Sequence, residues 1–225
     1  MKRLDSTVFQ MLHQKLVTSL GTAKELHLSS PLAYTDSALE VLLATIITQA
    51  TSDRNALKAW LRFKETYTSP GQALEKDESL LLEVLRPAGL EHQKSRKFRE
   101  VLAAVRERLG EYSLDKISGN PEEAWDFLCS LPGVGPKTAA CTMLFGLGHP
   151  AFPVDTHIQR IAVRMGWAPA TSKVEAIQTL LQQSIPQQLH QDLHILLLNL
   201  GRSYCRPRQR KCDVCPVGTH CRKDY

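Results

Sequence analysis

Hydrophobic residues recur at helical spacing along nearly the whole chain, and no stretch alternates as a strand would. The first predicted helix has Ser6 as its N-cap and ends at Gly21. Its apolar positions recur every four residues, at Val8, Leu12, Leu16 and Leu20. The same reasoning predicts further helices over 36–50, from the cap Ser52 through Phe63, and over 70–76, 77–86, 91–109, 121–130, 136–147, 155–167, 172–184 and 187–203. The pattern therefore predicts an all-α fold.

Two short stretches interrupt this helical pattern. Residues 148–154 (GHPAFPV) form the clearest linker, because their two prolines exclude a regular helix. A second break falls at 29–31. No internal repeat or low-complexity segment is visible.

The composition is that of a globular protein, with 43% hydrophobic residues in 225. No apolar run reaches the roughly 18–20 residues that a membrane span needs, and the first residues lack the apolar core of a secretory signal. We therefore expect a soluble intracellular protein with no membrane partner.

The net charge of +5 is concentrated at one end of the chain. Residues 201–225 hold seven basic and two acidic residues, which already gives +5, so the other 200 residues sum to zero. A neutral body with a basic end indicates contact with a polyanion at a defined place, although a solvated tail would have the same composition.

Four cysteines share this basic end, in the spacing C-x6-C-x2-C-x5-C. Four thiolates on one short segment can bind zinc or an iron–sulfur cluster, and a single C-x2-C flanked by two lone cysteines favours the cluster. The predicted ligands are Cys205, Cys212, Cys215 and Cys221. Between the first two lies a loop whose cations the cluster would hold in place: Arg206, Arg208, Arg210 and Lys211. The remaining cysteines, Cys129 and Cys141, are predicted to be core residues.

A glycine turn at 131–135 (LPGVG) leads directly into a predicted helix. Gly133 and Gly135 permit a tight turn, and the free N–H groups of a helix start favour an anion such as phosphate. A plain packing corner between two helices is the alternative. Lys137 follows in the first helical turn, where the positive helix end and partial burial both favour a neutral, nucleophilic amine. Its alternative role is contact with a phosphate.

Asp155 follows the linker and is expected to cap the next helix, which favours its ionised form. Taken alone, such an aspartate is usually structural. Paired with Lys137, it could accept a proton or stabilise a developing cation. His157, two positions on, is interpreted as structural.

The segments LPGVGPKTA, VDTH and the four cysteines, in this order, resemble the helix-hairpin-helix base-excision glycosylases of the endonuclease III family. The resemblance extends from about residue 35 over nearly the whole chain. It implies a bilobal all-α fold with DNA in the cleft between the lobes. One lobe would be a six-helix barrel over 31–149 bearing the hairpin, and the other an iron–sulfur cluster domain formed by 1–30 and 150–225.

The resemblance also assigns roles to individual residues. Lys137 matches the nucleophile, Asp155 the catalytic aspartate, and the four cysteines the ligands of a [4Fe–4S] cluster. Gln49 matches the residue that fills the gap left by an extruded base, and Leu90 the wedge on the opposite side of the duplex. The expected DNA contacts also include Gly133, Val134, Gly135, Thr138 and the cations of 206–211. The sequence departs from the family pattern at Pro136, Ser52 and Leu200.

The implied activity is that of a bifunctional DNA glycosylase and AP lyase in base excision repair. Its expected partner is double-stranded DNA containing damaged pyrimidines or abasic sites, bound by a monomer in a bacterial or archaeal cytoplasm, at the nucleoid. Two alternatives remain open at this point. One is a monofunctional mismatch glycosylase, which usually lacks the lysine. The other is a non-catalytic DNA-binding module with a zinc knuckle.

Overall fold

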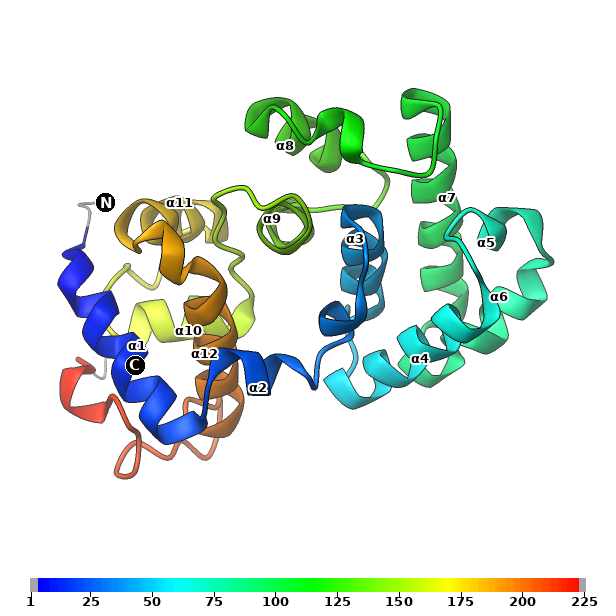
Figure 1. The fold of residues 1–225 in the computed structure, drawn as a ribbon. Coiled ribbons are helices and arrows are strands. Elements are labelled where there is room, and N and C mark those ends of the chain that lie inside the picture. The colour runs from blue at the N-terminus through cyan, green and yellow to red at the C-terminus, as the bar shows by residue number, and fades with distance from the viewer. Residues whose placement is uncertain (1–3, 223–225) are drawn as a thin grey trace. The chain divides into compact units, whose positions relative to one another are not determined.

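The structure, a computed structural model, describes residues 4–222, which contain helices and connecting turns but no strand. The chain divides into two compact units. One joins Met1–His27 to Pro150–Tyr225, and the other is Leu28–His149 (Figure 1). The second boundary coincides with the division placed at 149/150 from the sequence, and the first lies three residues before the one placed at 30/31.

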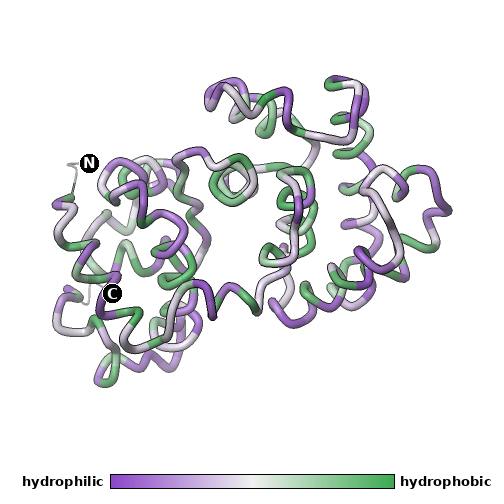
Figure 2. Tube along the Cα trace, in the orientation of Figure 1, coloured by the Kyte–Doolittle hydropathy of each residue, from purple (hydrophilic) through white to green (hydrophobic). Residues whose placement is uncertain are grey.

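The unit Leu28–His149 is built around one helix that is buried along its whole length. Every residue of α3 (Ala38–Ile47) is buried, including Glu40 and Thr45. The other α-helices of this unit are α4 (Asp53–Thr66), α5 (Gln72–Glu75), α6 (Glu78–Leu85), α7 (Glu91–Leu109), α8 (Pro121–Cys129) and α9 (Pro136–Cys141). Short 3₁₀ turns lie at Pro31–Tyr34, Arg86–Ala88 and Asp115–Ile117. Figure 2 shows how hydrophilic and hydrophobic residues alternate along these helices.

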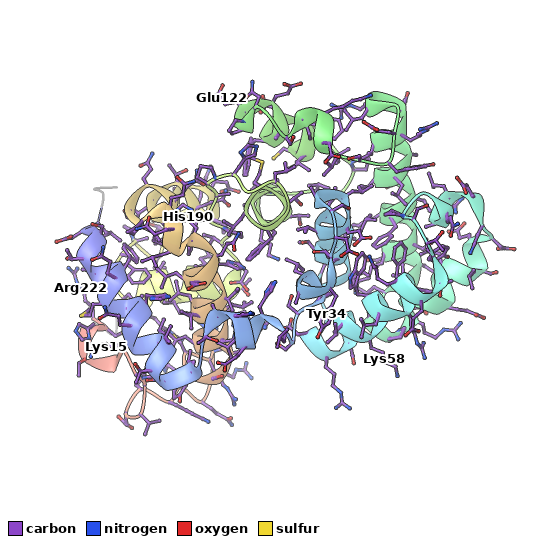
Figure 3. All side chains as sticks on the ribbon, in the orientation of Figure 1. Lys15, Tyr34, Lys58, Glu122, His190 and Arg222 are labelled. Atoms are coloured by element: carbon purple, nitrogen blue, oxygen red, sulfur yellow. The ribbon has the colours of Figure 1, made fainter. Side chains whose placement is uncertain are left out.

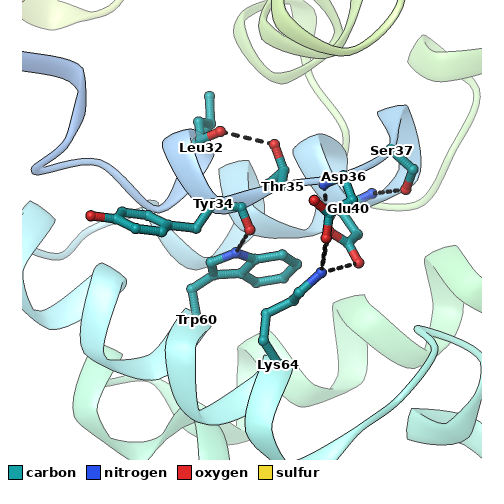
Figure 4. Close-up of polar contacts among 8 residues, drawn as sticks. All are labelled: Leu32, Tyr34, Thr35, Asp36, Ser37, Glu40, Trp60 and Lys64. Carbon is teal, nitrogen blue, oxygen red and sulfur yellow. Dashed lines mark hydrogen bonds and ion pairs between the residues drawn. The ribbon is translucent and has the colours of Figure 1, made fainter. Parts of the chain in front are cut away.

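The start of α3 is fixed by a small polar network, drawn in Figure 4. The Ser37 hydroxyl accepts from the backbone N–H of Glu40, and the Glu40 carboxylate accepts from the N–H of Asp36. Lys64 of α4 donates to Glu40 at 2.8 Å and to Asp36 at 2.6 Å. The buried Glu40 charge is thus compensated by a cation, as a buried carboxylate requires.

The other unit surrounds α12 (His190–Ser203), which packs against α1 (Ser6–Leu20), α2 (Ala23–His27) and α10 (Thr156–Arg164). Its remaining elements are α11 (Val174–Ser184) and two 3₁₀ turns, Gln187–Leu189 and Gly218–His220. His13 and Asp192 pair at 2.9 Å and join α1 to α12. His194 lies 3.0 Å from the Pro153 carbonyl and ties the proline linker to α12.

Most predicted helices are present, with shifted ends. Asp5, and not Ser6, caps the first helix, because its carboxylate accepts from the N–H of Thr7. The helix predicted over 136–147 is α-helical only as α9, from Pro136 to Cys141, and continues as a π-helical turn from Thr142 to Gly146. The short helix α2 was not predicted, since five residues carry too little periodicity.

The prediction for the two isolated cysteines was half wrong. Cys141 is buried as expected, but Cys129 is exposed at the end of α8. The buried face of α8 is supplied instead by Ala124, Phe127 and Leu128. A position at a helix end lies outside the reach of the periodicity argument.

No helix among the described residues is both long and apolar enough to cross a bilayer. Lys223 and Asp224, which were counted in the basic end, lie outside the described residues.

Gly146 is required by the close packing of this chain segment on α3. A Cβ at Gly146 would lie 2.8 Å from Cα of Ala38 and 3.3 Å from Cβ of Val41, and backbone cannot move aside. We expect Gly146→Ala to lower the free energy of unfolding by about 1–3 kcal/mol. Urea denaturation would measure it, with Gly119→Ala as the matched control, since no atom lies within 4 Å of a Cβ there. Equal stability of the two variants would contradict this packing.

Candidate active site and cysteine segment

The glycine turn lies between α8 and α9, as predicted. Gly133 has φ +69°, a conformation that favours glycine, and Gly135 is the N-cap of α9 without any side-chain cap. Val134 is buried and its N–H donates to the Leu131 carbonyl at 3.2 Å, so this amide is already used within the turn. The N–H groups of Gly133 and Gly135 have no partner among the described residues. The turn therefore offers two glycine amides, and not three, to a ligand.

Lys137 is half-buried in the first turn of α9. The residues that follow it, from Thr138 to Cys141, are buried and anchor the helix. Within its own unit, no described residue accepts a hydrogen bond from the Lys137 amine. Its backbone is thus fixed while its amine stays unengaged in this unit.

Gln49 follows the buried helix α3 and is held by two polar contacts. Its Nε2 donates to the Thr138 hydroxyl at 3.3 Å, and Lys97 of α7 donates to its Oε1 at 3.0 Å. The Lys97 stem also covers the glycine turn, since a Cβ at Gly133 would lie 3.1 Å from Lys97 Cε. The structure therefore gathers Gln49, Thr138 and the turn around Lys97, a residue that the sequence analysis did not select.

Leu90 is an exposed hydrophobic residue in a strained conformation. Its side chain is 49% exposed and its φ is +52°, which costs a non-glycine residue about 1–2 kcal/mol. Among the described residues, positive φ outside glycine occurs only here, at Ala50 next to Gln49, and at Gln209 within the basic loop. All three lie in or beside a segment predicted to contact DNA, and backbone strain of this kind clusters at functional sites.

Lys94 fixes the turn that carries Leu90. It is 3% exposed, its Nζ donates to the Ala88 carbonyl at 2.8 Å, and its backbone N–H donates to the Leu90 carbonyl at 2.9 Å. The pKa of Lys94 is lowered to about 8, chiefly by burial; the Glu91 charge opposes this shift and the Lys97 charge adds to it.

Asp155 lies in the other unit and caps α10 as predicted. Its Oδ1 accepts from the N–H of His157 at 2.9 Å and of Ile158 at 2.8 Å. Its side chain is half-buried. His157 packs against Gly201, where an added Cβ would lie only 2.6 Å from His157 Cβ, in keeping with the structural role expected of it.

Two arginines of α10 reach the cysteine segment. Arg160 donates to the Cys205 carbonyl at 2.7 Å and lies 3.0 Å from His157 Nδ1. Arg164 donates to Cys205 Sγ at 3.3 Å and to the Arg206 carbonyl at 2.8 Å, and its own carbonyl accepts from Cys221 Sγ. The helix capped by Asp155 therefore holds the start of the cysteine segment.

The four cysteines of this segment are half-buried, and Cys205, Cys212 and Cys221 lie near enough to Cys215 to influence it electrostatically. Burial raises the pKa of the Cys215 thiol, the N–H of Val217 lowers it, and Cys205, Cys221 and Cys212 each raise it again. Four cysteines on one short segment supply the kind of ligands that zinc or an iron–sulfur cluster takes. The described part of the chain shows no group of three or more His, Cys, Asp or Glu arranged to hold a single metal ion.

The basic loop between Cys205 and Cys212 is exposed at every position from 206 to 211. Arg206 donates back to the Arg202 carbonyl at 2.9 Å, and the N–H of Lys211 donates to the Tyr204 carbonyl at 3.1 Å. These contacts fix the base of the loop and leave its cations facing solvent.

The predicted residues fall into two groups, one in each unit. The unit Leu28–His149 holds the glycine turn, Lys137, Gln49 and Leu90, and the other unit holds Asp155 and the cysteines. The residues that support them were not predicted from the sequence: Lys94, Lys97, Arg160 and Arg164. The arginines were detectable from their helical spacing after Asp155, whereas nothing in the sequence marks the lysines.

The all-helical fold, the glycine turn with Lys137, and the cysteine segment are features of the helix-hairpin-helix base-excision repair proteins. Comparison with known proteins identifies the same class. The profile of the family described as "HhH-GPD superfamily base excision DNA repair protein" matches residues 43–187, so the chain belongs to this superfamily. It is 30% identical to endonuclease III of Thermotoga maritima over 80% of this chain and 81% of that one. It is 29% identical to endonuclease III of Sulfolobus acidocaldarius, over 84% and 83%. The chain is thus an endonuclease III-like enzyme of base excision repair.

Solved structures show the same fold. A trapped endonuclease III–DNA covalent intermediate matches with a TM-score of 0.78 and 25% identity, over 98% of this chain and 97% of that one. A thermostable thymine-DNA glycosylase matches with a TM-score of 0.79, over 97% and 98%, and at 20% identity this likeness concerns the fold alone.

The lowered pKa of Lys94 has a consequence for stability. Between pH 8 and 10.5 the unfolded state binds more protons than the folded state, so the Lys94 contribution to the free energy of unfolding rises with pH. We expect the difference in unfolding free energy, wild type minus Lys94→Met, to increase by up to about 3 kcal/mol over this window. Urea denaturation at several pH values would measure it. A difference that stays flat or falls with pH would show that burial does not lower the pKa of Lys94.

Proposed function

We propose that the protein is a bifunctional DNA glycosylase and AP lyase that removes oxidised pyrimidines from duplex DNA. The observation that carries this proposal is Lys137: a half-buried lysine in the first turn of α9, directly after a glycine turn, with an unengaged amine in its own unit. The similarity to endonuclease III supports the same reading.

The target nucleotide must leave the base stack before it can react, at a cost of a few kcal/mol. The neutral Lys137 amine then attacks the sugar C1′, forming a C–N bond while the glycosidic bond breaks and the base departs with its electron pair and a proton. Ring opening gives a Schiff base. Loss of a C2′ proton then expels the 3′ phosphate, which nicks the strand.

Asp155 supports this chemistry as a fixed carboxylate. Two backbone N–H groups hold its Oδ1 in place. Its charge stabilises the oxocarbenium-like state, and the carboxylate assists proton transfer.

Duplex DNA is the proposed partner, gripped through its backbone. The amides of Gly133 and Gly135 suit phosphate oxygens, and the exposed cations of 206–211 supply charge. Gln49 and Leu90 would fill the space left by the extruded nucleotide. Val134 and Thr138, both buried, would support the turn from behind.

The second candidate is a monofunctional mismatch glycosylase of the same superfamily. This alternative leaves the Lys137 amine without a role, which is why we rank it second.

A [4Fe–4S] cluster is the proposed cofactor, held by Cys205, Cys212, Cys215 and Cys221. Their spacing fits such a cluster, and Arg164 of α10 contacts both the first and the last of them, Cys205 and Cys221. When bound, it would order the segment structurally, and no step of the reaction requires an electron from it.

The cofactor proposal predicts a yellow-brown protein with about four irons per chain. Cys212→Ser should lose the visible absorbance, whereas Cys129→Ser should keep it, since Cys129 is exposed on α8 in the other unit. Absorbance and iron content measure the outcome. A colourless protein with one bound zinc would replace the cluster with a zinc knuckle.

The lyase proposal predicts a covalent adduct when borohydride is added to the protein on duplex DNA containing thymine glycol. Lys137→Gln should abolish this adduct, because it removes the only proposed Schiff-base nitrogen. Lys58→Gln, which changes a surface lysine of α4 (Figure 3), is the matched control and should form the adduct normally. Base release without any adduct in the wild type would favour the monofunctional alternative.

A further inference from the structure

Helix α7 contributes two lysines that the proposed chemistry does not use. Lys94 is buried and Lys97 half-buried, one turn apart on the same helix, and the charge of Lys97 is felt at Lys94. A buried lysine carries a desolvation cost, which its hydrogen bonds must offset.

The partners of these lysines are the two segments proposed to enter the duplex. Lys94 Nζ donates to the Ala88 carbonyl, and its backbone N–H donates to Leu90. Lys97 Nζ donates to Gln49 Oε1. We propose that α7 is a positioning element in which Lys94 fixes the turn of Leu90 and Lys97 fixes the amide of Gln49. This inference rests on the proposed function, since it assigns helpers to the two gap-filling residues.

The turn that carries Leu90 is strained and therefore needs a contact that holds it. Leu90 adopts φ +52° directly after Gly89 at φ +68°, so an untethered turn would relax and turn the leucine away. The bond from Lys94 to Ala88 closes this turn from inside the fold.

The side-chain amide of Gln49 must be oriented before it enters the duplex. A glutamine side chain loses rotamer freedom when it enters a duplex, and a charge-assisted hydrogen bond to Oε1 fixes it beforehand. The bond from Gln49 Nε2 to Thr138 sets the other side of the amide. Lys97 thereby places Gln49 beside the turn that carries Lys137.

A comparison of duplex and single-stranded substrates tests this role. Single-stranded DNA has no opposite strand, so a gap-filling residue does not contribute there. We expect Lys97→Met to slow nicking of an abasic-site duplex about tenfold, the worth of one charge-assisted hydrogen bond, while single-strand nicking changes less than about twofold. Methionine keeps the apolar stem over Gly133, and Lys97→Arg should restore most of the duplex rate.

Double variants separate positioning from general stability. In a Gln49→Ala background, Lys97→Met should cause no further loss, and in a Leu90→Ala background neither should Lys94→Met. Equal losses on duplex and single strand, or full additivity, would overturn the proposal. If Lys97→Met instead lowered the salt slope of binding by about one, Lys97 would be a phosphate contact.

If Lys94→Met folds poorly, a fluorescence measurement on Lys97→Met still tests the proposal. With 2-aminopurine opposite the abasic site, wild-type binding should raise fluorescence by unstacking that base, and Lys97→Met should reduce the rise. An unchanged rise would refute the positioning role. A wild-type protein that nicks no abasic DNA would refute the proposed function itself.

Discussion

The complete burial of α3 is the constraint on which the unit Leu28–His149 depends. All ten of its residues are buried, so the helix cannot slide or rotate without exposing apolar surface. Its first turn is fixed by the pair of Glu40 with Lys64, and Gly146 allows the chain after α9 to approach it at backbone distance. Gln49 follows the end of this helix, so the packing of α3 in the core fixes the position of its backbone.

Backbone strain occurs in or beside three segments that are proposed to contact DNA. Ala50, Leu90 and Gln209 hold left-handed conformations that cost free energy in the unbound protein. A cost met during folding does not have to be met again on binding, which is the benefit of preorganisation. The buried Lys94 stabilises the turn of Leu90 through its hydrogen bond to the Ala88 carbonyl.

The sequence predicted the helical class and most helix positions, because an apolar spacing such as Leu12 and Leu16 reports directly on a buried face. The sequence-based prediction was wrong at two helix ends. Asp5, and not Ser6, caps the first helix, because one hydrogen bond determines the cap. Cys129 is exposed because it lies at the end of its helix, where the apolar spacing no longer indicates burial. For the site, motifs identified the residues with distinctive chemistry. They could not identify Lys94 and Lys97, whose roles depend on contacts with Ala88 and Gln49 made through the tertiary fold.

The distribution of charge and amides bears on how selectivity arises. The exposed cations of 206–211 and the amides of Gly133 and Gly135 are suited to phosphates, which carry no sequence information. Binding through them would therefore be nearly equal on damaged and intact DNA. Discrimination must then come from the step in which a base leaves the stack, since a damaged, poorly stacked base leaves at lower cost. Under the proposed function, selectivity then depends on Gln49 and Leu90, which are proposed to enter the duplex, and on the contacts that Lys97 and Lys94 of α7 make with them.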